Sequence, residues 1–381
     1  MTDQFALTDE QREIQELARR FTADRITPFA AEWDERHIFP RETIRAAAEL
    51  GFGAIYVSEA AGGINLGRLE AALIMEAMAY GCPSTAAFIS IHNMASWMID
   101  RFGGREVREA YLPSLVSMDR IASYCLTEPG AGSDAAALKT RAVRDGDHYV
   151  VNGSKQFISG GGENEVYVTM VRTGADGPGG ISCLVIDKDM PGVSFGANER
   201  KLGWHSQPTA QVTFEDVRVP ADRRVGEEGD GFRIAMTGLD GGRLNIGACS
   251  LGGAQRCLDE SISYTRDRRQ FGSAIADFQH TRFTLADMAT ELEAARALLY
   301  VAAAKVTADS PDKTRFAAMA KRLATDTGSL VADRALQLHG GYGYLMDYPI
   351  ERIWRDLRVH SILEGTNQVM RMIVGRDLIR Q

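Results

Sequence analysis

The fold class of this chain is decided by one stretch near its middle, Tyr149-Val-Val-Asn-Gly-Ser-Lys-Gln-Phe-Ile158. β-Branched and aromatic residues, which favour strands, lie on both sides of Asn152-Gly153. Asn-Gly between such runs is the strongest short-range signal for a two-residue hairpin turn. The stretch therefore predicts a β-hairpin that turns at Asn152-Gly153.

Further strand patterns surround this hairpin and are separated by turns rich in Gly, Pro and Asp. The predicted strands are Ile121 to Leu126, Val166 to Val171, Ile181 to Ile186 and Gln211 to Val219. Together with the hairpin they predict a middle β domain over residues 119–228.

Helical spacing prevails before and after the strands. Before them, the predicted elements are a capping box at Thr8-Asp-Glu-Gln11, a helix between Pro40 and Gly51, a helix over Arg68 to Tyr80 and a helix from Pro83. After them, the predicted amphipathic helices are Leu258 to Arg268, Phe278 to Val306 and Lys313 to Leu338. The chain is therefore predicted to be mainly α with a central β domain, flanked by helical domains over residues 1–118 and 229–381.

Composition and charge exclude several classes of function. The formal net charge is −8 at pH 7 and no run of Lys or Arg occurs, which argues against nucleic-acid binding. No apolar segment approaches the roughly 20 residues that cross a bilayer. The five cysteines are scattered without a metal-binding spacing, and no H-E-x-x-H or G-x-S-x-G motif is present. We expect a soluble protein with reduced thiols, no metal site and no hydrolase chemistry.

A glycine-rich loop follows the first predicted strand, in Leu126-Thr-Glu-Pro-Gly-Ala-Gly-Ser-Asp-Ala135. Residues 130–135 match the dinucleotide fingerprint G-x-G-x-x-A, which requires a helix to begin at the glycines. Leu138 to Val143 lead instead into an Asp-Gly turn and another strand, so we do not expect a nicotinamide-binding unit. The loop is either a plain turn or a site where backbone N–H groups, Thr127 and Ser133 hold a phosphate or a flavin edge.

A single carboxylate stands out near the C-terminus, in Arg358-Val-His-Ser-Ile-Leu-Glu-Gly-Thr-Asn-Gln-Val-Met-Arg371. A carboxylate against apolar neighbours loses hydration, so the pKa of Glu364 is expected to rise and to make it a usable base near neutral pH. Gly365 leaves room for a ligand, and Thr366 to Gln368 predict a helix start. By themselves these residues favour a simpler interpretation, a first-turn glutamate that the helix dipole stabilises.

Two arginine-containing segments also have two interpretations each. Arg266-Asp-Arg-Arg-Gln-Phe-Gly272 is predicted at a helix end, where its guanidinium groups either are solvated or grip a pyrophosphate. The same choice applies to Asp240-Gly-Gly-Arg243. His92, in a helix that is apolar on most sides, is expected to be a core or capping residue.

In combination, these stretches resemble the acyl-CoA dehydrogenase family over essentially the whole chain. The specific signatures are Tyr124-Cys-Leu-Thr-Glu-Pro-Gly-Ala-Gly-Ser-Asp134, and Gln337-Leu-His-Gly-Gly-Tyr-Gly-Tyr344 followed by Glu364-Gly-Thr-Asn367. The resemblance implies an N-terminal helical domain, a middle β-barrel or sandwich domain and a C-terminal four-helix bundle.

Three further segments are most similar to the branch of this family that acts on isobutyryl-CoA. They are Phe157-Ile-Ser-Gly-Gly-Gly-Glu163, Gly203-Trp-His-Ser-Gln-Pro-Thr209 and Leu239-Asp-Gly-Gly-Arg-Leu-Asn-Ile246. This similarity implies a short branched acyl-CoA as the substrate, with isobutyryl-CoA converted to methacrylyl-CoA in valine breakdown.

The resemblance implies FAD as the cofactor, bound between the β domain and the C-terminal helices. The implied FAD-binding positions are Tyr124, Leu126, Thr127 and Ser133 in the glycine-rich loop; Phe157, Ile158 and Ser159 on the flavin ring; Arg268, Phe278, Gln279, Gln337, Leu338, His339, Gly340 and Gly341 at the diphosphate and adenosine; and Thr366, Asn367 and Gln368 after the base. Some of the diphosphate and adenosine positions are implied to act across a subunit interface. Many relatives carry Trp where this chain has Phe157, but the phenyl ring keeps an aromatic face at that position.

By the same resemblance, Glu364 takes the place of the catalytic base. The implied substrate-binding positions are Ser133, Asp240, Gly241, Gly242, Arg243 and Arg376. The Glu364 N–H and a flavin ribityl hydroxyl are implied to bind the thioester carbonyl and to stabilise the enolate. Glu364 then removes the α-proton while the β-hydrogen leaves as hydride to flavin N5.

The family resemblance also implies partners and a compartment. An electron-transfer flavoprotein is the implied electron acceptor, and a homotetramer, a dimer of dimers, is the implied assembly. Asp3, Glu10 and Glu13 fall where a mitochondrial leader avoids acidic residues. We therefore expect a bacterial cytoplasmic protein or the mature form of a mitochondrial matrix protein.

Other functions remain compatible with the sequence. Within the family, a straight short-chain or 2-methylbutyryl specificity is the first alternative, followed by an acyl-CoA oxidase, although the chain length fits dehydrogenases better. A flavin monooxygenase on this scaffold is expected to lack Glu364. A catalytically silent assembly or binding protein on the same fold is the alternative outside enzymes, against which the intact base and glycine-rich loop argue.

Overall fold

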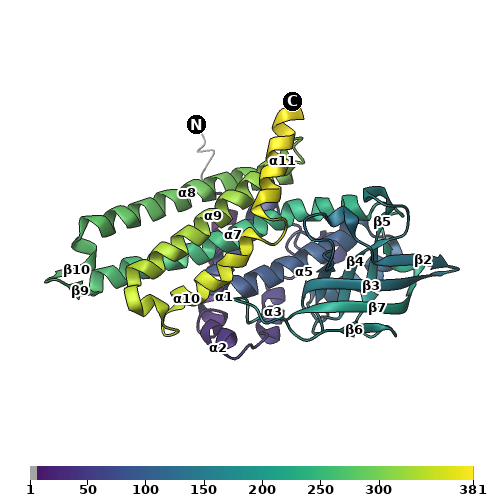
Figure 1. Ribbon diagram of the computed structural model, residues 1–381, viewed down its shortest axis with the longest axis horizontal. Helices are drawn as coiled ribbons and strands as arrows, with labels where there is room; N and C mark the ends of the chain where they lie inside the picture. The colour runs from purple at the N-terminus through teal and green to yellow at the C-terminus, as the bar shows by residue number, and fades with distance from the viewer. Residues whose placement is uncertain (1–6, 381) are drawn as a thin grey trace.

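The computed structural model describes residues 7–380, without the side chain of Arg380, so Asp3 and the outermost ends of both predicted helical domains lie outside the described residues. A helical body forms one part of the molecule and a β domain the other (Figure 1). The first helices are α1 (Asp9–Arg25), α2 (Ala30–Glu35), α3 (Arg41–Glu49), α4 (Arg68–Gly81), α5 (Pro83–Phe102) and α6 (Arg105–Val116). Thr8 and Gln11 exchange side-chain and backbone hydrogen bonds of 3.0 and 3.2 Å, which confirms the predicted capping box.

The β domain follows as one sheet with the strand order β6-β7-β3-β2-β4-β5-β8, and β1 pairs in parallel with β4. Its strands are β1 (Ala122–Cys125), β2 (Arg141–Asp145), β3 (His148–Ser159), β4 (Val166–Arg172), β5 (Ile181–Asp187), β6 (Val193–Phe195), β7 (Thr209–Pro220) and β8 (Arg224–Val225). Tyr149, Val151 and Tyr167 belong to a buried cluster that fills the inside of this curved sheet.

The predicted hairpin turn at Asn152-Gly153 is wrong. β3 continues through both residues, and its pairing with β7 shifts register between Val151 and Gly153, which is a β-bulge. Asn152 exchanges two hydrogen bonds of 2.9 Å with Asp216 of β7. The turn between β2 and β3 lies earlier, at Gly146, whose φ is +62°. β3 pairs with a strand on each side, and this tertiary pairing outweighs the local turn preference of Asn-Gly.

The C-terminal part consists of long helices that lie against α4 and α5. Its elements are α7 (Gly231–Asp267), the hairpin β9 (Arg269–Gln270) and β10 (Ser273–Ala274), α8 (Gln279–Thr307), α9 (Lys313–His339), α10 (Pro349–Arg358) and α11 (Asn367–Arg380). The predicted helix Leu258 to Arg268 is the last third of α7 and not a separate element. In Figure 1, α7 runs from the β domain to the β9–β10 hairpin at the opposite end.

A shared core joins the two helical parts. One buried cluster contains residues of α1, α4 and α5 together with residues of α7, α8 and α9. Glycine permits a close approach of α7 to α4, because a Cβ added to Gly252 of α7 would lie 2.1 Å from the Glu76 carbonyl oxygen of α4. The predicted fold class, mainly α with a central β domain, is confirmed.

Candidate active site

Glu364 lies on the loop between α10 and α11, directly above the backbone of α7. A Cβ added to Gly242 would lie 2.3 Å from Glu364 Oε2, so only glycine leaves room for the carboxylate at this position. Glu364 itself has a φ of +52°, in the left-handed region, and Gly365 follows at +89°. A non-glycine residue in this region costs on the order of 1 kcal/mol or more, a strain that often marks functional sites. The structure therefore contradicts the simpler interpretation of Glu364 as a first-turn residue, because α11 begins three residues later.

The surroundings of the Glu364 carboxylate favour a base that works near neutral pH. Oε2 is buried and has no hydrogen-bond partner among the described residues. Burial raises the pKa of Glu364 to about 7, although the positive charges of Lys321 and Arg243 act in the opposite direction. The backbone N–H of Glu364 also lacks an acceptor within residues 7–380. A free N–H beside a buried carboxylate can bind a carbonyl oxygen of a ligand.

Asp240 and Arg243 lie next to this loop, buried inside α7 and not solvated at a helix end. The two side chains form a buried ion pair of 2.7 Å, and the Thr314 hydroxyl donates a 2.6 Å hydrogen bond to Asp240. Arg243 Nε also approaches the Glu364 carbonyl oxygen at 3.4 Å. The structure thus brings Gly242, Arg243 and Glu364 together.

Sequence reasoning missed Arg68, which packs on the neighbouring position of α7. A Cβ added to Gly241 would lie 2.4 Å from Arg68 Nη1. The guanidinium stacks over the rings of Tyr56 and Trp97, at 3.8 and 4.9 Å from their centroids. Nothing in the local pattern around Arg68 marks it, because its aromatic partners are remote in sequence.

The polar residues after Glu364 lie at the start of α11. Thr366 Oγ1 accepts a 3.2 Å hydrogen bond from the Val369 N–H, so the predicted helix start is confirmed. In α11, Met370 is buried, whereas Leu378 is 57% exposed. Gln368 is exposed at the start of α11.

The glycine-rich loop after β1 is organised by a buried ion pair that sequence reasoning missed. Lys155 of β3 is fully buried and donates hydrogen bonds to the Leu126 carbonyl oxygen at 3.1 Å and to Glu128 at 2.7 Å. Glu128 also accepts from two backbone N–H groups across the loop, those of Lys139 and Thr140. The signal in the sequence is a lysine at an inward-facing position of a β-rich stretch.

This loop presents open backbone toward a ligand. Cβ atoms added to Gly130 and Gly132 would meet nothing within 4 Å, and Ser133 is exposed. Only a three-residue 3₁₀ turn, Ala135–Ala137, follows before β2, so the expectation that no Rossmann helix begins here is confirmed. Thr127 and Leu126 lie at the base of the loop.

Two aromatic residues beside the loop complete a surface suited to a flat ring. The hydroxyl of Tyr124 in β1 is buried without a partner among the described residues. Phe157 is 64% exposed because β3 shifts register between Lys155 and Ile158 and the φ of Phe157 is +59°. Ile158 instead points into the core, and the Ser159 carbonyl oxygen accepts a 2.7 Å bond from Ser123. The unpartnered hydroxyl, the open glycines and the exposed ring fit an isoalloxazine ring and its phosphate chain.

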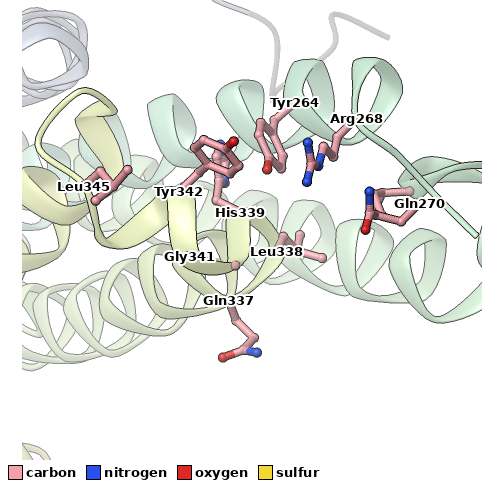
Figure 2. Close-up of a pocket in the computed structure, with 11 residues that line it drawn as sticks. Tyr264, Arg268, Gln270, Gln337, Leu338, His339, Gly341, Tyr342 and Leu345 are labelled. Atoms are coloured by element: carbon pink, nitrogen blue, oxygen red, sulfur yellow. The ribbon is translucent and has the colours of Figure 1, made fainter.

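A separate pocket lies at the far end of α7 and α9 and has a volume of about 540 Å³. Its lining includes the sequence-predicted residues Arg268, Gln337, Leu338, His339, Gly340 and Gly341, together with Tyr264 and Tyr342. Figure 2 shows Tyr264, Tyr342 and Arg268 gathered on one side, whereas the Gln337 side chain points away from them. His339 Nε2 is buried without a partner within residues 7–380. These features fit an adenosine and diphosphate.

Besides Ile158, which points into the core, three sequence-predicted residues are not brought into either group. Phe278 and Gln279 lie at the start of α8, outside the lining of the pocket, and Phe278 packs against Phe271. Arg376 is exposed on α11 and forms no side-chain hydrogen bond or ion pair with the described residues.

The two groups lie at well-separated positions along α7. Gly242 and Asp267, the last residue of α7, are 25 residues apart on one helix, or about 38 Å at the α-helical rise. The carboxylate of Glu364 and the pocket are therefore far apart within one chain.

Within residues 7–380, no group of three or more His, Cys, Asp or Glu side chains could hold a metal ion. In the same part of the chain, every helix is too short or too polar to cross a membrane.

Comparison with known proteins gives the family. Residues 8–119, 123–217 and 229–379 match the models of the N-terminal, middle and C-terminal domains of acyl-CoA dehydrogenase. The chain is 56% identical to the mitochondrial isobutyryl-CoA dehydrogenase of Dictyostelium discoideum and 52% identical to that of Bos taurus. Each alignment covers 98% of this chain and 90% of the relative.

Solved structures agree with this result. One chain comes from work on the electron transferring flavoprotein of Acidaminococcus fermentans and is 41% identical, with a TM-score of 0.96 and coverage of 99% of this chain and 100% of that one. A chain from the FAD complex of PigA is 31% identical, with a TM-score of 0.95 and coverage of 98% of both chains.

Fold and site together define an FAD-dependent oxidoreductase. The chain belongs to the acyl-CoA dehydrogenase family.

Proposed function

We propose that this enzyme oxidises a short branched acyl-CoA, converting isobutyryl-CoA to methacrylyl-CoA in valine breakdown. The observation that carries the catalytic part is the buried, unpartnered carboxylate of Glu364, with a pKa of about 7, beside its own free N–H. Support for the branched substrate comes from the relatives in Dictyostelium discoideum and Bos taurus, which are named isobutyryl-CoA dehydrogenase.

Glu364 does two things in the proposed reaction. Its backbone N–H donates a hydrogen bond to the thioester carbonyl oxygen, which stabilises the negative charge that develops there. Its carboxylate accepts the α-proton, and the C–H electron pair forms the new double bond as the β-hydrogen leaves with its two electrons. FAD, when bound, supplies the chemistry of accepting that hydride. Gly242 contributes by leaving space for the base.

The remaining residues bind and orient. We assign the flavin end of FAD to the loop with Tyr124, Leu126, Thr127 and Ser133, to Phe157 and to the Thr366–Gln368 segment. The adenosine end is assigned to the pocket with Arg268 and Gln337 to Gly341 on a second subunit. The substrate is assigned to Ser133 and to Asp240 to Arg243. Phe278 and Gln279, which lie outside both groups in one chain, are assigned contacts with the adenosine end across the subunit interface, and Arg376 is assigned to the substrate.

The assembly and the electron acceptor are part of the same proposal. A shared cofactor site requires at least a dimer, and a homotetramer built as a dimer of dimers satisfies this requirement. An electron-transfer flavoprotein is the proposed acceptor, in line with the similar chain from work on such a protein. The proposed compartment is the mitochondrial matrix, as the names of the two relatives suggest, or the cytoplasm of a bacterium.

Anaerobic titration of the FAD-loaded enzyme with acyl-CoA thioesters tests the proposal. We expect isobutyryl-CoA to bleach the oxidised flavin absorbance faster than butyryl-CoA or 2-methylbutyryl-CoA. Faster bleaching by butyryl-CoA or 2-methylbutyryl-CoA would contradict the proposed substrate but support the proposed reaction. A fully loaded enzyme that responds to none of them would overturn the proposed function.

A further inference from the structure

Lys321 is a buried cation that no sequence pattern connected with catalysis. It lies in the middle of α9 between Ala317 and Ala324, on the face that packs into the core, and its side chain is fully buried. Its ammonium group donates hydrogen bonds to the Gly365 carbonyl oxygen at 2.8 Å and to Asn367 Oδ1 at 3.0 Å. Gly365 belongs to the loop that carries Glu364, and Asn367 is the first residue of α11.

The same loop is held by further bonds from α9. Asn367 Nδ2 donates to Thr325 Oγ1 at 2.9 Å and to Asp326 Oδ1 at 2.7 Å. One helix therefore fixes both residues that flank Thr366, and with them the strained backbone of Glu364. A base must be held within a fraction of an ångström of its productive position, so such a clamp has catalytic value.

The charge of Lys321 is not neutralised by a direct partner. Its two acceptors are neutral oxygen atoms, and no carboxylate in the described part of the chain forms an ion pair with it. Burial lowers the pKa of Lys321 to about 8, while the charge of Glu364 acts to raise it. The ammonium and the Glu364 carboxylate therefore interact through a poorly screened interior.

Other groups around Glu364 do not supply this charge. The groups that face it or act on it are Arg243, Asp240 and Cys249 from α7, Lys321 and Asp326 from α9, Tyr124 from β1, His360 before the loop, and Tyr56. Arg243 is the other cation that lowers the pKa of Glu364, and Asp240 pairs with it at 2.7 Å. Arg68, beside Gly241, lies over the rings of Tyr56 and Trp97. Burial keeps His360 neutral, because it lowers the pKa of this residue to about 3.

We propose that Lys321 is the positioning residue of the catalytic base, because it clamps the Glu364–Asn367 loop onto α9 and holds an unneutralised positive charge beside the carboxylate. This inference rests on the proposed role of Glu364. The clamp keeps the carboxylate over Gly242, and the charge keeps a part of the base ionised although burial opposes it. Without the ammonium, the pKa of Glu364 is expected to rise further.

The test is a pH titration of the Glu364 carboxyl band by infrared difference spectroscopy in the FAD-loaded enzyme. Subtraction of the spectrum of Glu364→Gln identifies the band. Lys321→Met keeps the side-chain length and removes the charge, so we expect the Glu364 pKa to rise by about one unit or more. Thr325→Val is the matched control, since it weakens the same clamp and keeps the charge, and we expect a shift of less than about 0.3 unit.

One further variant and one further readout complete the test. Lys321→Gln retains a hydrogen-bond donor without the charge, and it replaces Lys321→Met if that variant does not fold. The acidic limb of the flavin reduction rate should move with the infrared titration. A Glu364 pKa that stays within about 0.3 unit of the wild-type value in the neutral variants would overturn the proposal. If Glu364→Gln retains full turnover, the proposed function fails, but the infrared titration still decides the effect of Lys321.

Discussion

Lys155 and Lys321 are two fully buried lysines that hold two functional loops by the same device, and they differ in one respect. Each donates a hydrogen bond to a backbone carbonyl oxygen, that of Leu126 in the glycine-rich loop and that of Gly365 in the base loop. Lys155 also forms a 2.7 Å ion pair with Glu128. Lys321 has no such partner in residues 7–380.

The difference teaches how a fold assigns a buried charge to structure or to chemistry. Burial alone would raise the pKa of Glu128, but Lys155 beside it holds that pKa below its ordinary value, and the two groups pair at 2.7 Å. The opposite charges of Lys155 and Glu128 largely cancel at a distance, so the pair fixes the shape of the glycine-rich loop and does not act on Glu364. The charge of Lys321 remains available to Glu364, which is the reacting group.

The largest effect on the rate of flavin reduction is expected when the base itself is replaced. Replacing Glu364 by Gln removes the proton acceptor but keeps the shape of the loop, so flavin reduction by isobutyryl-CoA should slow by on the order of 10³-fold or more. FAD content should remain at the wild-type level, since the glycine-rich loop is untouched. Stopped-flow absorbance and the flavin-to-protein ratio measure the two quantities. Turnover near the wild-type rate would remove Glu364 from its role.

The second effect is a loss of stability when the ion pair between Lys155 and Glu128 is broken. Lys155→Met leaves Glu128 buried without its cation, which should lower the free energy of unfolding by about 3–5 kcal/mol. FAD retention should fall as well, because the loop loses its anchor, while the Glu364 pKa should not move. Denaturant unfolding and the infrared titration check both statements. A shift of the Glu364 pKa equal to that in Lys321→Met would erase the contrast between the two lysines.

A smaller effect tests the contact between the base and α7. Gly242→Ala places a methyl group where the Glu364 carboxylate lies, so the carboxylate must move and flavin reduction should slow by roughly 10²-fold. Gly375→Ala is the matched control, because a Cβ added there meets nothing within 4 Å. Rates from single-turnover measurements should separate the two variants. Equal rates in both would show that the carboxylate tolerates displacement.

The smallest effect is expected on FAD retention, when Arg268 at the C-terminal end of α7 is replaced. Arg268→Ala should weaken FAD retention by about tenfold or less, since the guanidinium is only one of several groups in an open pocket. Arg269→Ala is the control, because Arg269 is exposed and does not line that pocket. Flavin loss on dilution, followed by fluorescence, measures retention. Equal FAD retention in both variants would contradict the assignment of Arg268 to the FAD-binding site.

Local patterns were reliable where neighbouring residues decide the structure. The capping box at Thr8 and the helix start at Pro83 depend on contacts within a few residues, and the runs from Val166 and Ile181 are rich in β-branched residues; all four elements form as predicted. The Asn152-Gly153 turn failed because the pairing partners of β3 lie elsewhere in the chain. A local turn signal cannot report a strand that is held from both sides.

For the site, the sequence by itself determined that Glu364 is a carboxylate among apolar neighbours and that a glycine-rich loop follows a strand. Its motifs also placed the chain in its family. Only the tertiary structure decided that Gly242 lies beneath the carboxylate, that Lys321 clamps the loop and that Lys155 is neutralised by Glu128. These contacts join residues that are 27 to 122 positions apart. Folding alone brings such residues within the few ångströms over which hydrogen bonds and buried charges act.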